Sequence, residues 1–105
     1  MNVKELAEGL GLDEEEYVEL LDLFIKTGIS DLDTLQSAVI AKDPEKAMQA
    51  AHSIKGAAGN LGLKDFFQQA KQVEDNARKG ILEGAADSIE RLKQHLVVLE
   101  ALGRG

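Results

Sequence analysis

Hydrophobic residues recur along this chain at spacings of three and four residues, the period of an amphipathic helix. Glycines and a single proline interrupt the pattern and mark the expected helix ends. Nothing resembles the apolar and polar alternation of a strand. The pattern predicts an all-α protein with a short leading helix and longer helical segments over approximately these ranges: 2–8, 13–42, 44–60, 63–79 and 83–102.

The segment 13–42 allows two interpretations. Asp13 and Glu16 have the spacing of a helix N-cap and the carboxylate that completes a capping box. Gly28 could end this helix, after which Ser30 would start another, or one long helix could bend near Gly28. The sequence leaves both alternatives open.

Each predicted helix carries one apolar stripe, which must be buried against its neighbours. Four principal helices joined by short turns favour an antiparallel up-and-down four-helix bundle, lengthened or capped by an additional short N-terminal helix. We expect residues 1–105 to form a single domain with residues 103–105 as a frayed tail. Predicted core positions include Tyr17, Leu20, Leu21, Phe24 and Ile25 early in the chain and Ala86, Ile89, Leu92, Leu96, Leu99 and Leu102 in the last helix.

Composition and charge narrow the classes of function. The net charge of −7 opposes binding to the nucleic-acid backbone, and the absence of cysteine removes disulfides and thiolate metal sites. We expect a cytoplasmic protein without a membrane segment, because no targeting or long apolar run is visible. Residues 42–79 nevertheless hold seven basic and five acidic side chains. This local excess of basic side chains indicates docking to an acidic or phosphorylated partner site, or else it is ordinary scatter of surface charge.

The segment 51–62 combines chemistry with bare backbone. A helical projection places Met48, His52, Lys55 and Gly59 on one stripe beside the apolar stripe of the same helix. Each interior glycine costs a helix about 1 kcal/mol relative to alanine, so Gly56 and Gly59 call for a reason. Without side chains at these positions, another molecule can approach the backbone beside the imidazole.

Several catalytic arrangements are excluded by spacing. The glycines do not have the spacing of a phosphate-binding loop, and Ser53 has no evident base for a hydrolytic triad. A metal site is unsupported because His52 and His95 are distant in sequence, and His95 is interpreted as a partly exposed structural histidine. What remains is phosphorylation of His52, whose neutral imidazole is a nucleophile at neutral pH. Lys55 could neutralise charge on the transferring group, and a partner carrying magnesium could complete the reaction.

The run His52-Ser53-Ile54-Lys55-Gly56, with its continuation Ala57-Ala58-Gly59-Asn60-Leu61-Gly62, resembles the signature of histidine-containing phosphotransfer (HPt) domains of two-component phosphorelays. The resemblance extends over about residues 13–102. It implies that His52 accepts a phosphoryl group from a phospho-aspartate on a receiver domain, or from a kinase, and passes it to a response-regulator aspartate. It also implies a phosphocarrier without kinase activity, with no cofactor of its own and with magnesium on the receiver.

The resemblance assigns further residues. Lys55 would support the phosphoryl group and Gly56 would give the partner access, while Glu74 stands where a carboxylate or amide often holds the other imidazole nitrogen. A solvated glutamate on an exposed face is the alternative for Glu74. We expect partner contacts also from four other residues, of which the two lysines are the weaker candidates: Met48, Gly59, Lys64 and Lys71.

Two rival functions stay open. The bundle could be an interaction module that binds a partner through the groove around His52 without phosphotransfer, or the dimerising hairpin of a histidine kinase. We favour a monomeric carrier, because no ATP-binding domain follows and the helices suffice to close a bundle. The start at Met1 and the lack of a linker favour a whole chain over an excised domain. The sequence does not identify the cognate kinase or receiver, the direction of transfer or the stimulus.

Overall fold

The computed structural model describes residues 2–104, which form helices and turns without any strand. This confirms the all-α prediction. The helix boundaries lie within about two residues of the expected ones. The helices are α1 (Val3–Gly9), α2 (Glu14–Ile40), α3 (Pro44–Asn60), α4 (Lys64–Arg78) and α5 (Ala85–Gly103).

The long segment that the sequence left open is one continuous helix, α2. A capping box starts it: Glu16 N–H donates to Asp13 at 2.8 Å, and Asp13 N–H donates to the Glu16 side chain at 3.1 Å. Gly28 lies buried in the middle, where an added Cβ would be 3.4 Å from both Leu96 methyl groups. Gly28 therefore marks a close approach between α2 and α5 instead of a helix end.

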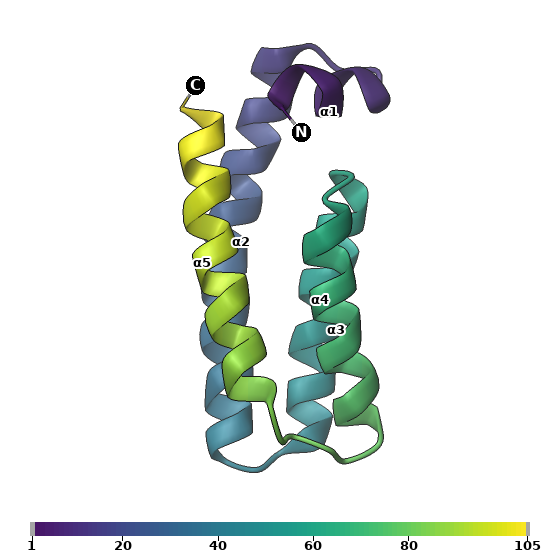
Figure 1. The fold of residues 1–105 in the computed structure, drawn as a ribbon, viewed down its shortest axis with the longest axis vertical. Helices are drawn as coiled ribbons and strands as arrows, with labels where there is room; N and C mark the ends of the chain where they lie inside the picture. Colours follow the sequence, from purple (N-terminus) through teal and green to yellow (C-terminus); the bar gives the residue numbers. More distant parts are fainter. Residues whose placement is uncertain (1, 105) are drawn as a thin grey trace.

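The four long helices run alternately up and down, and α1 lies across one end of the bundle (Figure 1). Helix α2 packs against α3 and α5, α3 packs against α4, and α4 also contacts α5. This arrangement is the predicted antiparallel four-helix bundle with a short additional N-terminal helix. The figure places α3 and α4 side by side as a hairpin, which sets two helix faces next to each other.

Local chemistry fixes both ends of α3. The Asp43 side chain accepts from Lys46 N–H at 3.1 Å, and Pro44 occupies the first turn, where its missing N–H costs nothing. At the other end Gly62 has φ +71°, the left-handed conformation that a tight exit from a helix requires. The buried Tyr17 hydroxyl donates to the Leu61 carbonyl at 2.7 Å, so α2 anchors the α3–α4 turn.

Most of the predicted apolar positions form one core, but two do not. Leu20 is 42% exposed, because the buried face of α2 is the stripe that contains Tyr17, Leu21 and Phe24, and Leu20 lies outside that stripe. Ala86 is exposed, while Ala85 is buried. Eleven residues make three helical turns, so Ala85 shares the direction of Leu96 and Ala86 does not.

The predicted frayed tail is also wrong at Gly103, which belongs to α5. An added Cβ at Gly103 would lie 3.4 Å from a Leu21 methyl group, and Arg104 Nη2 lies 2.6 Å from Glu100 Oε1. Gly105 is outside the described residues. Within residues 2–104, no helix is both long enough and apolar enough to cross a membrane.

Candidate functional site

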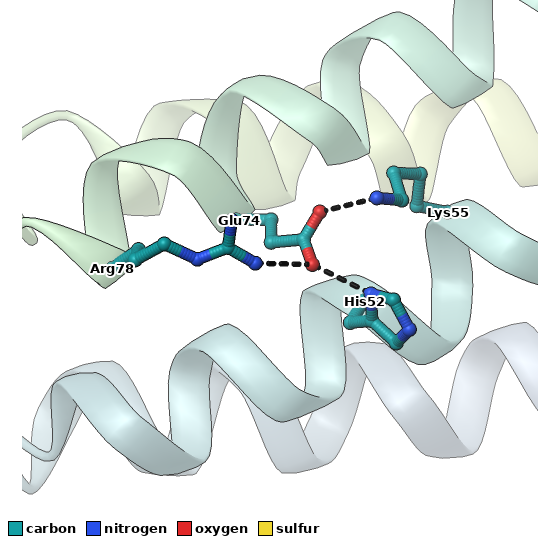
Figure 2. Close-up of polar contacts among 4 residues, drawn as sticks. All are labelled: His52, Lys55, Glu74 and Arg78. Carbon is teal, nitrogen blue, oxygen red and sulfur yellow. Dashed lines mark hydrogen bonds and ion pairs between the residues drawn. The ribbon is translucent and has the colours of Figure 1, made fainter.

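The α3–α4 hairpin brings together the imidazole, the ammonium group and the carboxylate that the sequence singled out (Figure 2). His52 lies on the third turn of α3 and its side chain is 67% exposed. Lys55 follows one turn later and is 21% exposed. Figure 2 shows both side chains directed toward Glu74 on the neighbouring helix α4.

Glu74 is the buried centre of this group, with a side chain that is 1% exposed. Its Oε2 lies 2.6 Å from His52 Nδ1, and its Oε1 lies 2.6 Å from Lys55 Nζ. The predicted contact between Glu74 and the second imidazole nitrogen is therefore present, and the alternative of a solvated glutamate is wrong. Glutamate is rarely buried without partners, and here both carboxylate oxygens have them.

A fourth residue, Arg78, completes the group and was missed by the sequence analysis. Its Nη2 lies 3.2 Å from Glu74 Oε2, the oxygen that His52 also contacts, and its side chain is 61% exposed. A signal was available, because residues four apart on a helix lie on the same face and a glutamate followed by an arginine at that spacing can pair.

The electrostatics of the group keep Glu74 ionised. Burial acts to raise the pKa of Glu74, but the hydrogen bonds and positive charges of Lys55 and His52 outweigh it, so the pKa lies below its ordinary value. An ionised carboxylate can only accept hydrogen bonds. His52 Nδ1 therefore donates its N–H to Oε2, and in the neutral imidazole this leaves the lone pair on Nε2.

This arrangement presents a nucleophile. The Nδ1–H···Oε2 hydrogen bond fixes the imidazole tautomer, and the exposure of the ring makes Nε2 available to another molecule. Lys55 and Arg78 together outweigh the single negative charge of Glu74, so these three side chains carry a net positive charge beside the ring. Such a site suits the attack of a nitrogen on a phosphoryl group.

The two glycines near His52 differ in their surroundings. An added Cβ at Gly56 would meet nothing within 4 Å, so this backbone is open to a partner. An added Cβ at Gly59 would lie 3.3 and 3.4 Å from two ring atoms of Phe67 on α4. Gly59 therefore has a packing role between α3 and α4, which the sequence analysis did not anticipate, and its contact with a partner stays a prediction.

The other predicted contact residues do not join the hydrogen-bonded group. Met48 is half-buried one turn before His52, and it borders a shallow concavity together with Arg78. Lys71 is exposed on α4 one turn before Glu74, and Lys64 is exposed at the start of α4. Among the described hydrogen bonds and ion pairs, none joins either lysine to His52. Their roles remain predictions.

His95 lies elsewhere and has the expected structural setting. It is half-buried on α5, with its ring 5.3 Å from the ring of Phe66. In the part of the chain that the structure describes, no three histidine or acidic side chains gather closely enough to hold a metal ion.

Comparison with known proteins identifies one matching family model and several similar proteins. The family model for the Hpt domain matches residues 19–102. A crystal structure of histidine-containing phosphotransfer protein B (HptB) from Pseudomonas aeruginosa PAO1 is 31% identical in sequence. Its superposition has a TM-score of 0.83 and covers 94% of this chain and 86% of HptB.

Two longer proteins contain a similar segment. The aerobic respiration control sensor protein ArcB of Escherichia coli K12 is 28% identical over 89 residues, which are 76% of this chain and 11% of ArcB. The chemotaxis protein CheA of Halobacterium salinarum is 31% identical over 94 residues, which are 79% of this chain and 14% of CheA. The chain thus spans only a small fraction of the length of these curated relatives.

Proposed function

The chain belongs to the Hpt domain family and has a phosphotransfer role in a two-component phosphorelay, and we propose that His52 is the residue that carries the phosphoryl group. The observation that supports this assignment best is the pairing of an exposed imidazole with a buried, ionised carboxylate at 2.6 Å. His95 has no such partner among the described contacts, and its ring packs on Phe66.

In the proposed reaction, Nε2 of His52 attacks the phosphorus of an aspartyl phosphate on a receiver domain. The N–P bond forms as the P–O bond to the aspartate breaks, and the aspartate carboxylate leaves with the electron pair of that bond. The Nδ1 proton stays on the ring, so the phosphorylated imidazole carries a positive charge next to Glu74 Oε2. Transfer to a second receiver aspartate is the same reaction in reverse.

The chain supplies positioning and charge to this step. Glu74 holds the tautomer that leaves Nε2 free and stabilises the positive charge that develops on the ring. Lys55 and Arg78 offset Glu74 and favour the anionic phosphoryl group. We expect magnesium to come with the receiver domain, where it would neutralise the remaining charge of the transition state.

The form of the protein is part of the proposal. We propose a monomeric cytoplasmic phosphocarrier that has no ATP-dependent kinase activity, with a receiver domain, a sensor kinase or both as partners. Open backbone at Gly56 beside the exposed ring supports docking of a receiver at this face. Sedimentation over a range of protein concentrations tests whether the protein is a monomer. An obligate dimer would instead support the alternative of a dimerising hairpin of a histidine kinase.

The direct test is to incubate the protein with magnesium and with receiver domains charged by acetyl phosphate, followed by intact mass measurement under mildly alkaline conditions. We expect the mass of one phosphoryl group to be gained by the wild type and by His95→Gln but not by His52→Gln. Gain of mass by His52→Gln would refute the assignment of the residue. If a folded monomeric wild type gains none from any receiver of a broad panel, the protein is an interaction module.

A further inference from the structure

We propose that Arg78 is a positioning residue for the phosphotransfer reaction, acting on His52 through their shared contact with Glu74 Oε2. This inference rests on the proposed function of His52, and it concerns a residue outside the sequence motif. Both contacts end on one oxygen, at 2.6 Å from His52 Nδ1 and 3.2 Å from Arg78 Nη2. His52 Nδ1 and Arg78 Nη2 therefore lie close together, separated by no more than the sum of these two distances.

The carboxylate of Glu74 is held at three points. Lys55 Nζ contacts Oε1, while His52 and Arg78 contact Oε2. Without Arg78 the carboxylate would be held by Lys55 and by His52 itself, and the ammonium group of Lys55 stands on a flexible stem that accepts many orientations. A guanidinium group offers planar, directional donors. Arg78 on Oε2 therefore fixes the orientation in which this oxygen faces the imidazole (Figure 2).

The helix itself supplies this support. Arg78 and Glu74 are one turn apart on α4, so their contact does not depend on a partner or on the neighbouring helix. His52 belongs to α3, so the orientation of Glu74 is set on one helix and used on the other. If the guanidinium group of Arg78 were removed, water would occupy the second acceptor position of Oε2. Water exchanges with solvent and does not fix the orientation of the carboxylate.

The exposure of Arg78 suggests a competing role. A cation that is 61% exposed on the docking face could instead bind acidic residues of the receiver directly. The two roles differ in what they predict for kinetics. A positioning residue affects the maximal transfer rate and acts only when Glu74 is present, whereas a docking cation affects the KM for the receiver whether or not Glu74 is present.

A double-mutant cycle separates these roles. Transfer from a charged receiver is measured for the wild type, Arg78→Gln, Glu74→Gln and the double variant, with Lys79→Gln as the control that removes the adjacent exposed charge. We expect Arg78→Gln to lower the maximal rate about threefold or more without changing KM, and to have no further effect in the Glu74→Gln background. Arg78→Lys should restore part of the rate. A changed KM, an effect that persists without Glu74, or an unchanged rate would overturn the proposal.

A second measurement needs no partner. Diethyl pyrocarbonate modifies unprotonated imidazole nitrogens, and peptide mass spectrometry distinguishes His52 from His95. We expect Arg78→Gln to slow modification of His52 about threefold only when Glu74 is present, and to leave His95 unchanged. Equal His52 rates in the wild type and Arg78→Gln would overturn the positioning role even if phosphotransfer occurs. If the effect of Arg78→Gln on His52 modification depended on Glu74 but no phosphotransfer occurred, the positioning of His52 by Arg78 would stand and the proposed function would be refuted.

Discussion

His52 Nδ1 lies 2.6 Å from Oε2 of Glu74, although the imidazole is 67% exposed and the glutamate side chain is 1% exposed. The proposed phospho-acceptor thus belongs to the surface, while its carboxylate partner belongs to the interior. Burial of a carboxylate is unfavourable unless charged or hydrogen-bonding partners compensate, and His52, Lys55 and Arg78 supply them. The site is therefore a partly buried network and cannot be treated as an isolated surface histidine.

Replacement of Glu74 by glutamine should slow phosphotransfer while keeping the fold. Glutamine has nearly the same size, but its neutral amide no longer stabilises a positively charged ring and does not enforce one tautomer. We expect the maximal transfer rate in Glu74→Gln to fall about ten- to a hundredfold. Rapid-quench kinetics with a charged receiver measures this rate, with the exposed Glu90→Gln on α5 as the control. An unchanged rate would show that Nε2 reactivity does not depend on Glu74.

Glu74 should also shape the acid dependence of stability. Burial acts to raise the pKa of Glu74, but the hydrogen bonds and charges of Lys55 and His52 lower it below the ordinary 4.5. The unfolded chain therefore takes up the proton first as the pH falls. The stabilising contribution of Glu74 is complete above pH 4.5 and is lost as the pH falls through the lower pKa of the folded state.

Urea unfolding at a series of pH values tests this sign. Other carboxylates titrate in the same range, so the informative quantity is the difference between the wild type and Glu74→Gln. We expect this difference in the free energy of unfolding to favour the wild type more at neutral pH than at about pH 3, which lies below the ordinary glutamate pKa of 4.5. A difference in the free energy of unfolding that stays constant with pH would contradict a lowered pKa for Glu74.

Gly56 should tolerate a side chain in the free protein but not in the complex. Nothing lies within 4 Å of an added Cβ, so Gly56→Ala should raise the free energy of unfolding by about 0.5–1 kcal/mol through helix propensity. Gly56→Gln should keep this stability while raising the KM for the receiver about tenfold, because the longer side chain occupies the backbone face beside His52. An unchanged KM would place the docking surface elsewhere.

Gly59 should respond differently. An added methyl group would lie 3.3 Å from the Phe67 ring, so part of the gain in helix propensity is offset by crowding. We expect Gly59→Ala to stabilise the protein less than Gly56→Ala, as measured by thermal or urea unfolding. Equal gains from the two substitutions would show that the Phe67 ring moves without cost.

Tyr17 provides a test of the anchoring of the site hairpin. Tyr17→Phe removes the donor to the Leu61 carbonyl while keeping the ring, and leaves a buried acceptor without this bond. We expect the free energy of unfolding to fall by about 1–2 kcal/mol, measured by urea denaturation. A change smaller than the experimental error would mean that water replaces the hydroxyl at Leu61.

The hydrophobic pattern was sufficient to predict the bundle, because each helix buries one apolar stripe. It did not identify the buried residue where two neighbouring positions were almost equivalent. Ala85 and Ala86 are chemically identical, and Ala85 is the buried one because it lies three helical turns before Leu96 and shares its direction. Gly28 was ambiguous for another reason. Glycine at a helix end and glycine at a close helix contact look the same in sequence, and the position of Leu96 decides between them.

The site was predictable in part. His52, Lys55 and Glu74 could be proposed from the motif and the family resemblance, and the structure places them in contact. Arg78 lies outside the motif, and its importance depends on the burial of Glu74, which the sequence does not show. The packing of Phe67 on Gly59 likewise depends on how closely α3 and α4 approach.

All four residues of the network come from consecutive helices joined by the short turn at Gly62. The described contacts of the network therefore lie within residues 52–78, and none of them involves a side chain of α1, α2 or α5. The proposed chemistry is thus carried by one helical hairpin, while the helices packed against it hold that hairpin in place.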